Sequence, residues 1–98
     1  MQIRFSVHFK TQWGESLILL LSKPSARYTD KGMEFTMRCN EKSEWTIEIE
    51  LENSVKLLSY RYAVCETNGF YHYEFGNERT LELPDSRNKI QIYDNWRG

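Results

Sequence analysis

The sequence predicts an all-β fold, an antiparallel β-sandwich of about eight strands. Apolar and polar residues alternate with a period of two in several short segments, and turn residues separate these segments at close spacing. The alternating segments lack the apolar spacing of an amphipathic helix. A chain of 98 residues has room for one hydrophobic core, so we expect a single domain over 1–98. This size suits an immunoglobulin-like sandwich.

Four strands are predicted in the first half of the chain. Alternation over 3–9 indicates a half-buried strand, and the continuous apolar run 17–21 is typical of a central strand covered on both faces. The period of two returns over 33–39. It is clearest over 45–51, where tryptophan, isoleucine and leucine alternate with threonine and glutamate.

Four further β-rich runs are predicted in the second half, at 57–66, 70–75, 79–83 and 89–93. The residues between them favour turns. Asn68-Gly69 permits the positive φ of a tight hairpin, Gly76-Asn77 forms a second separator, and Pro84-Asp85 can start a turn. The eight strands are therefore expected to be short and connected mostly by turns.

Charge and hydropathy exclude several classes of partner. Thirteen Lys and Arg against fourteen Asp and Glu leave a net charge of −1, which gives no long-range attraction to nucleic acid or anionic lipid. The five apolar residues 17–21 are far too few to span a bilayer, and 1–10 alternates instead of forming a secretion signal. We expect no nucleic acid or membrane partner, a cytoplasmic location and a monomeric domain.

Metal and thiol chemistry is not indicated. Cys39 and Cys65 lie far apart and form no metal-ligand spacing, so we expect buried free thiols, no disulfide, no metal and no cofactor. His8 lies on the polar side of its predicted strand, and His72 lies between two tyrosines. Both histidines are expected to be solvated.

Catalytic motifs are also missing from the sequence. It contains no GxSxG, GxxxxGK[ST], HExxH or GxGxxG. Glu74 and Glu78 are the carboxylates that might be paired as in a glycosidase, but that chemistry requires a cleft around a sugar, which a small sandwich seldom forms. We predict no catalytic residue.

Aromatic residues make up 14% of the chain, and some are expected on its surface. Trp13 lies in 11–15, which is predicted to be a turn, where an indole has no assured core to enter. The alternative is that Trp13 packs under a neighbouring loop. Alternation also predicts one shared face for Tyr60 and Tyr62 and another for Tyr71 and Tyr73. Exposed rings suit the C–H faces of pyranose sugars, and also bases.

Several motifs, in their order and spacing, resemble the starch-binding domain of carbohydrate-binding module family 20. The resemblance runs nearly from end to end. It is carried by Phe5-x-Val7, Thr11-x-Trp13-Gly14-Glu15, a leucine-rich strand ending in Ser22, Trp45 at the start of a strand, Tyr60-Arg61-Tyr62, Tyr73-Glu74-x-Gly76-Asn77-Glu78-Arg79-x-Leu81-x-Leu83-Pro84 and Asp94-x-Trp96-Arg97.

The resemblance implies an antiparallel β-sandwich with two α-glucan sites. The implied residues of site 1 are Tyr73, Glu74, Arg61, Asn77 and Tyr28, and those of site 2 are Trp13 and Trp45. Site 1 departs from the family pattern. Tyr73 stands where the family has Trp, Asn77 lies one residue early because Glu78 precedes Arg79, and the family's LGxW loop is missing.

In place of the LGxW loop, 22–28 offers Tyr28 as the nearby aromatic residue. Trp45 has an alternative as well, because an alternating strand would also place it in the core. Both assignments therefore depend on which way these rings face.

The function implied by the resemblance is noncatalytic binding of starch, glycogen or maltooligosaccharide. The chain begins with Met and stops after the closing Asp94-x-Trp96-Arg97 motif, so we expect the N-terminal module of a larger enzyme. The resemblance favours a 4-α-glucanotransferase as that enzyme, with a glycerophosphodiester phosphodiesterase as the alternative. Two other classes of function stay open: a sandwich that packs on its own catalytic domain with degenerate sugar sites, and a barrel face whose tyrosines stack bases.

Overall fold

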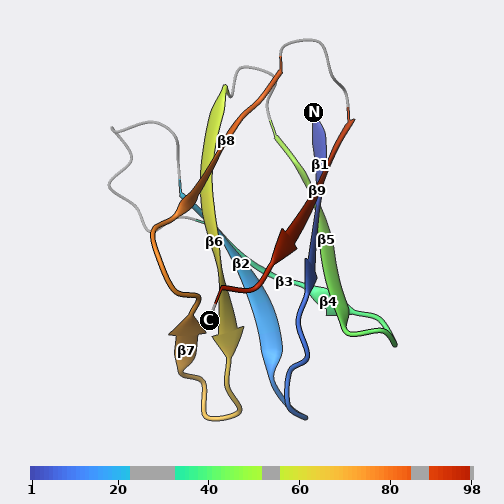
Figure 1. Ribbon diagram of the computed structural model, residues 1–98, viewed down its shortest axis with the longest axis vertical. Coiled ribbons are helices and arrows are strands. Elements are labelled where there is room, and N and C mark those ends of the chain that lie inside the picture. Colours follow the sequence, from blue (N-terminus) through green and yellow to red (C-terminus); the bar gives the residue numbers. More distant parts are fainter. Residues whose placement is uncertain (23–32, 52–55, 85–88, 98) are drawn as a thin grey trace.

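The computed structural model describes residues 1–22, 33–51, 56–84 and 89–97, and these residues form two β-sheets packed face to face (Figure 1). Among them, no helix is long and apolar enough to cross a membrane. The strands are β1 (Gln2–His8), β2 (Ser16–Ser22), β3 (Met33–Thr36), β4 (Arg38–Cys39), β5 (Glu44–Glu50), β6 (Leu57–Cys65), β7 (Tyr71–Tyr73), β8 (Arg79–Glu82) and β9 (Lys89–Asn95). The predicted all-β sandwich is confirmed.

One sheet has four strands in the order β4-β5-β1-β9, and the other has the order β3-β2-β6-β7 with β8 also paired to β6. All pairs are antiparallel except β1 with β9, which are parallel. Parallel pairing is possible here because β9 follows a strand of the other sheet, so no tight hairpin sets its direction. The sandwich is thus predominantly, and not entirely, antiparallel.

The predicted strand 33–39 is divided between the two sheets. β3 pairs with β2, whereas β4 pairs with β5. The chain crosses between the sheets at Met37, which is 3% exposed and donates its backbone N–H to the Leu17 carbonyl at 2.9 Å. A strand that changes sheets keeps the period of two, so alternation alone does not reveal the break.

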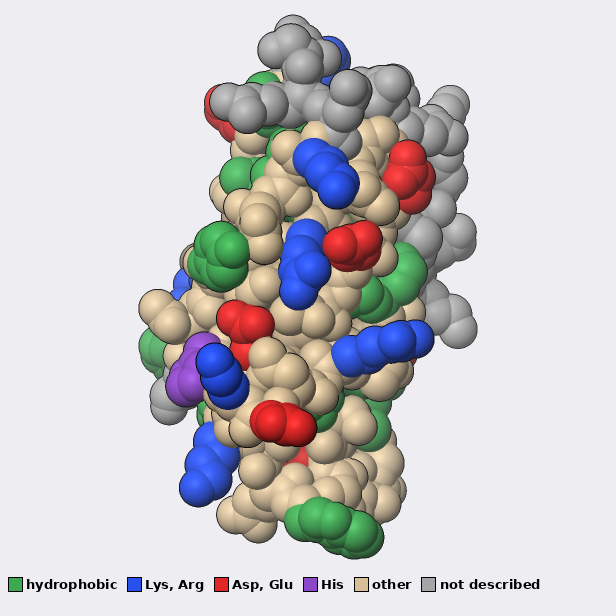
Figure 2. All heavy atoms as spheres, turned by 90° about the vertical axis from the view of Figure 1, so that its right-hand side faces the viewer, with side chains coloured by type: hydrophobic (Ala, Val, Ile, Leu, Met, Phe, Trp, Pro, Cys, Tyr) green, Lys and Arg blue, Asp and Glu red, His purple; other side chains and the backbone are tan. Residues whose placement is uncertain are grey.

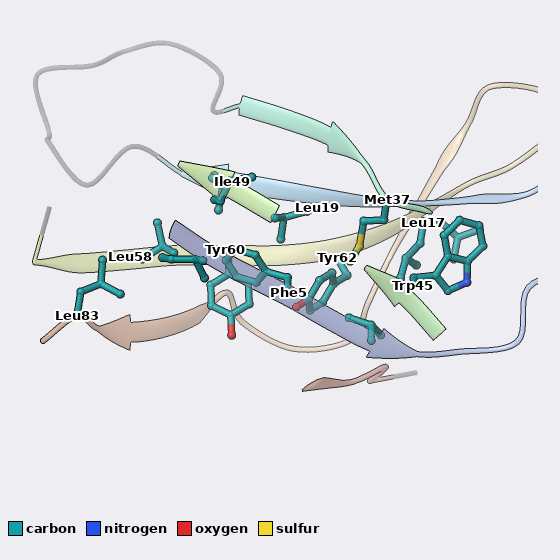
Figure 3. Packing of buried hydrophobic residues seen from close by; sticks show 14 residues of the cluster. Phe5, Leu17, Leu19, Met37, Trp45, Ile49, Leu58, Tyr60, Tyr62 and Leu83 are labelled. Carbon is teal, nitrogen blue, oxygen red and sulfur yellow. The ribbon is translucent and has the colours of Figure 1, made fainter. Parts of the chain in front are cut away.

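The core lies between the sheets and is built from the inward-facing residues of strands in which apolar and polar residues alternate (Figure 3). Burial of Leu17, Ile18, Leu19 and Leu21 agrees with the predicted central strand covered on both faces. Alternation also places Tyr60 and Tyr62 inward, at 4% and 0% exposure. Their rings therefore cannot stack bases, and the base-stacking alternative is wrong for this pair.

The two cysteines are free, as expected, but the prediction that both are buried is wrong. Cys39 is exposed and Cys65 is half-buried. The physical reason is position in the sheet, because β4 is an edge strand of its sheet and leaves Cys39 open to solvent on one side.

The outer face of the four-stranded sheet is polar. Figure 2 shows side chains of both charge signs interspersed on the face of the molecule where β5 lies. Arg4 and Glu48, on paired strands, form an exposed ion pair there at 3.6 Å. Mixed charges of this kind create no concentrated field for a polyanion.

Candidate functional site

A buried charged network anchors the chain directly after β7. The side chain of Glu74 is 0% exposed, and its carboxylate accepts hydrogen bonds from Arg79 Nε at 3.0 Å and Arg79 Nη2 at 2.8 Å. It also accepts the backbone N–H of Tyr62 at 3.2 Å, and Arg97 Nε lies 3.6 Å away. The buried carboxylate is thus surrounded by two guanidinium groups and one backbone N–H.

Asp94 of β9 continues this network into the other sheet. Its carboxylate accepts hydrogen bonds from the hydroxyl groups of Tyr60 at 2.9 Å and Tyr62 at 2.8 Å, and it lies 3.3 Å from Arg79 Nη1. Burial raises the pKa of both tyrosines, and the neighbouring Asp94 charge and hydrogen bond raise it further. The tyrosines therefore stay neutral donors, and Asp94 connects β9 with β6 and β8.

The pKa of Glu74 is lowered by its partners. Burial by itself raises this pKa, but the hydrogen bonds and charge of Arg79, the Tyr62 N–H and the charge of Arg97 together outweigh burial. Glu74 is therefore an ionised structural anchor. The resemblance assigned Glu74 to a sugar site, and the structure instead hides its carboxylate from any ligand at the surface.

The loop 74–78 is held against the C-terminal segment. Phe75 donates its N–H to the Arg97 carbonyl at 2.6 Å, and Arg97 Nη2 donates to the Asn77 carbonyl at 2.7 Å. Gly76 has φ of +98°, and a Cβ there would meet Arg97 Nη1 at 3.4 Å. The side chain of Asn77, in contrast, belongs to an exposed residue.

Tyr73 forms an exposed ring beside this loop. Its side chain is 49% exposed, and the Arg61 guanidinium carbon lies 4.8 Å from the ring centroid. Arg61 Nη2 also donates to the Glu74 carbonyl at 3.3 Å, while Arg61 Nε is buried without a partner in the described structure. The fold thus brings Arg61 to the ring of Tyr73 and to the backbone of Glu74, and no contact in the described structure joins Asn77 to this pair. Tyr28 lies outside the described residues.

Trp13 is 97% exposed, so the prediction of an exposed indole is confirmed and the packed alternative is wrong. Two hydrogen bonds close its turn. Glu15 donates its N–H to the Gln12 carbonyl at 3.0 Å, and the Glu15 carboxylate accepts the Gln12 N–H at 2.7 Å. Gly14 has φ of +88°, and its backbone lies so close to Thr67 that a Cβ would come within 2.7 Å of the methyl group.

Trp45 does not join Trp13. It lies in the core at 6% exposure (Figure 3). Its indole N–H donates to the Phe9 carbonyl at 3.1 Å. The physical reason is the alternation of β5, which sends Trp45 to the same side as Ile49. This corrects the implied role of Trp45 as an open stacking ring.

Some exposed rings were missed by the sequence analysis. Phe70 is 69% exposed, Phe75 80% and Tyr93 69%. The signal for the first two was their position beside Gly69 and Gly76, where a residue in a turn cannot rely on the period of a strand to find the core. Tyr93 is one of the alternate residues of the edge strand β9 that face outward, together with the polar Lys89 and Gln91.

The remaining chemistry of the described surface is sparse. The described residues bring together no group of three or more His, Cys, Asp or Glu side chains that could hold a metal ion. Both histidines are exposed, as predicted. One hollow of the described surface lies between Arg4, Glu48 and Lys89.

Comparison with known proteins identifies similar chains. The Starch binding domain family matches residues 1–93. Comparison with curated protein sequences gives no significant match.

Solved structures with the same fold include the glycoside hydrolase family 15 glucoamylase from Hypocrea jecorina, with a TM-score of 0.78, 14% identity and coverage of 99% of this chain and 17% of that one. The γ-CGTase from alkalophilic Bacillus clarkii has a TM-score of 0.77 and 17% identity, with coverage of 99% and 15%. The Hormoconis resinae glucoamylase has a TM-score of 0.75 and 24% identity, with coverage of 99% and 17%. The chain therefore corresponds to about a sixth of each of these proteins, and at these identities the likeness concerns the fold.

Proposed function

The chain belongs to the starch-binding domain family, carbohydrate-binding module family 20, and on that premise we propose that it binds α-1,4-glucan through Trp13 and Tyr73 without cleaving it. The observation that carries the proposal is the 97% exposure of Trp13 on a turn fixed by hydrogen bonds. An indole leaves the core at a cost in apolar burial, and that cost is recovered when the ring is covered by a ligand.

The Trp13 turn is suited to stacking on a sugar. Aromatic rings bind the apolar C–H face of a pyranose, and a rigid ring loses little conformational entropy on binding. Because Gly14 packs on Thr67, the ring is presented by two turns in contact, at the end of the sandwich where β1 leads into β2 and β6 leads into β7 (Figure 1). A preorganised ring of this kind avoids part of the ordering cost of binding.

The Tyr73 site combines a ring with polar groups. Tyr73 offers a stacking surface, the Arg61 guanidinium lies over its ring, and Asn77, four residues further along the chain, is exposed and can offer its amide to sugar hydroxyl groups. Glu74 acts through structure, since it holds the strand and loop that present the site. Sites this open bury little area, so we expect weak affinity at each site, and two sites on one chain raise the effective concentration of the second binding event.

The partner of this module is proposed to be an attached catalytic domain, and we propose a 4-α-glucanotransferase. The support is the resemblance in the sequence, together with the fact that the matched region is about a sixth of the larger chains. In such a protein the module would keep the enzyme on its glucan substrate, whether starch or glycogen.

A second candidate is a protein-interaction module that packs on its own catalytic domain. Phe75, 80% exposed beside Tyr73, favours it, because a large exposed apolar ring is typical of interface anchors. Tyr73 differs from Phe75 in having the Arg61 guanidinium over its ring. We place glucan binding first because the family match, the exposed Trp13 and the Tyr73–Arg61 pair all favour it.

Titration of maltoheptaose or β-cyclodextrin into the isolated chain, followed by calorimetry and by NMR shifts, tests the proposal. We expect Trp13→Ala and Tyr73→Ala each to remove one site, and the double variant to remove all binding. Tyr93→Ala is the matched control, because Tyr93 is 69% exposed on the other sheet and should leave binding unchanged. If the wild-type chain shows no shifts at millimolar oligosaccharide, the glucan proposal is wrong and the interaction module becomes the better account.

A further inference from the structure

A tyrosine on one edge of the five-stranded sheet reaches the opposite edge. Tyr71 lies on β7, and its hydroxyl donates to Glu34 Oε2 on β3 at 2.8 Å. The order β3-β2-β6-β7 places two whole strands between these residues. Three strand spacings amount to roughly 14 Å of lateral separation. Both side chains must therefore be almost fully extended along the sheet, and the ring cannot stand upright from it.

The direction of this side chain follows from the register. Tyr71 pairs with Cys65, Tyr73 pairs with Ala63, and Glu34 pairs with Leu20. Because Tyr62 and Val64 point into the core, their neighbours on β6 point outward, and the same parity carries across the paired strands. Tyr71, Tyr73 and Glu34 thus share the outer face.

Two apolar residues of the outer face lie along the line between the bonded side chains. Ala63 and Ile18 pair with each other and both have outward parity, yet they are 0% and 5% exposed. A ring lying flat across the sheet from Tyr71 toward Glu34 passes over this part of the surface. The arrangement explains how Tyr71 can be partly buried while its hydroxyl bond remains at an exposed position.

Tyr71 also contacts the ring of the proposed glucan site. The centroids of Tyr71 and Tyr73 are 6.3 Å apart, with 68° between the ring planes. Arg61, which lies on the ring of Tyr73, has the same outward parity. The two rings therefore form a bent aromatic surface, with a guanidinium at Tyr73 and a carboxylate at the far end of Tyr71. A bent surface matches a helically curved chain of sugars better than a flat one.

We infer that Tyr71 is a second stacking ring of the Tyr73 site, and that Glu34 pins it flat so that bound glucan extends from β7 across the outer face of the sheet toward β3. The inference rests on the proposed glucan-binding function. It supplies a second ring from residues of the sheet itself. The hydroxyl of Tyr71 and the second oxygen of Glu34 then lie at the level of the sugar, where both can contact its hydroxyl groups.

Chain length is the readout that separates this role from a purely structural one. An oligosaccharide long enough to pass from Tyr73 over Tyr71 gains contacts that a short one cannot reach. We therefore expect Tyr71→Ala to weaken maltoheptaose binding about tenfold, in keeping with the magnitude of stacking on one ring. Binding of maltose, which covers a single ring, is expected to change by less than twofold.

The role of Glu34 is tested by a double-mutant cycle. Tyr71→Phe keeps the ring and removes its hydroxyl, and Glu34→Ala removes the acceptor. Each is expected to weaken maltoheptaose binding by about threefold, and the two together by no more than either alone, because both release the same ring. These two variants keep the inference testable even if Tyr71→Ala does not fold, and the melting temperature of each variant reports its stability.

The outcomes are distinguishable from failure of the proposed function. If the wild-type chain binds maltoheptaose and Tyr73→Ala weakens it, but Tyr71→Ala, Tyr71→Phe and Glu34→Ala leave its affinity unchanged, then the inference is overturned and the glucan function stands. Equal losses for maltose and maltoheptaose would also overturn it, since they would indicate a general disturbance of the site. If the wild-type chain does not bind maltoheptaose, both the proposed function and this inference are wrong. Tyr93→Ala serves again as the control on the other sheet.

Discussion

Replacement of Glu74 by glutamine is the sharpest test of the charged network, because the change keeps the size of the side chain and removes its charge. The Glu74 carboxylate is 0% exposed and accepts two hydrogen bonds from Arg79, at 2.8 and 3.0 Å. Glutamine retains one acceptor oxygen and turns an amide NH2 toward a guanidinium that can only donate. Arg79 would keep Asp94 at 3.3 Å as its remaining carboxylate.

The expected loss of stability for Glu74→Gln is large. Breaking a buried ion pair by removal of one partner costs about 3–5 kcal/mol, and the retained Asp94 contact places this case near about 3 kcal/mol. For a domain of this size, that corresponds to a fall in Tm of roughly 12–24 °C. Urea unfolding followed by tryptophan fluorescence at pH 7, with thermal unfolding by circular dichroism, measures both quantities.

Glu48→Gln is the matched control. Glu48 makes an ion pair with Arg4 at 3.6 Å, but both side chains are almost half exposed, at 49% and 44%. The same chemical change there should alter stability by less than about 0.5 kcal/mol. If Glu74→Gln unfolds at the wild-type midpoint and instead loses glucan binding, then Glu74 is a ligand contact, and our account of it as a buried anchor is refuted.

Three further perturbations test other parts of the structure. Acidification should destabilise the wild type as the pH falls below the ordinary glutamate pKa of 4.5. The lowered pKa of Glu74 contributes stability that is present above this value and is lost as the carboxylate protonates in the folded state. Equal urea midpoints at pH 7 and at a pH well below 4.5 would contradict this. Gly14→Ala should cost about 1–2 kcal/mol for its left-handed backbone, and more from the 2.7 Å approach to Thr67, with weaker glucan binding at Trp13; a urea midpoint equal to wild type argues against the close contact. Trp45→Ala should cost about 3–5 kcal/mol, whereas Trp13→Ala should cost less than about 0.5 kcal/mol, and similar losses in thermal unfolding would mean that the two indoles have been assigned to the wrong environments.

The strands were predictable because burial of one face imposes a local period. Ile3, Phe5 and Val7 enter the core from the parity that alternation indicates, and all three are 0% exposed. The division of 33–39 was not predictable in this way. Met37 passes from one sheet to the other while the alternation continues, so only the partners of β3 and β4 reveal the break.

The candidate site was predictable where local chemistry decides and not where distant partners decide. A turn residue such as Trp13 is exposed because no strand directs it inward, and this is visible in the sequence. Glu74 and Tyr73 are adjacent in the chain but differ in burial. The Glu74 carboxylate lies in the interior beside Arg79 and Arg97, whereas Tyr73 faces solvent. The family resemblance placed both residues at a sugar site, because short motifs do not show which of two adjacent side chains is buried and which is exposed.

By itself the sequence determined the strand-forming segments, the all-β class, the exposed Trp13 turn and the family. Each of these depends on neighbouring residues or on the order of short motifs. Tertiary structure alone decided that Trp45 is core, that Asp94 connects the sheets, and that Tyr71 reaches Glu34 across two strands. The physical reason is that burial, ion pairing and cross-sheet hydrogen bonds are set by residues that are far apart in the chain, and their distances exist only once the sheets have paired.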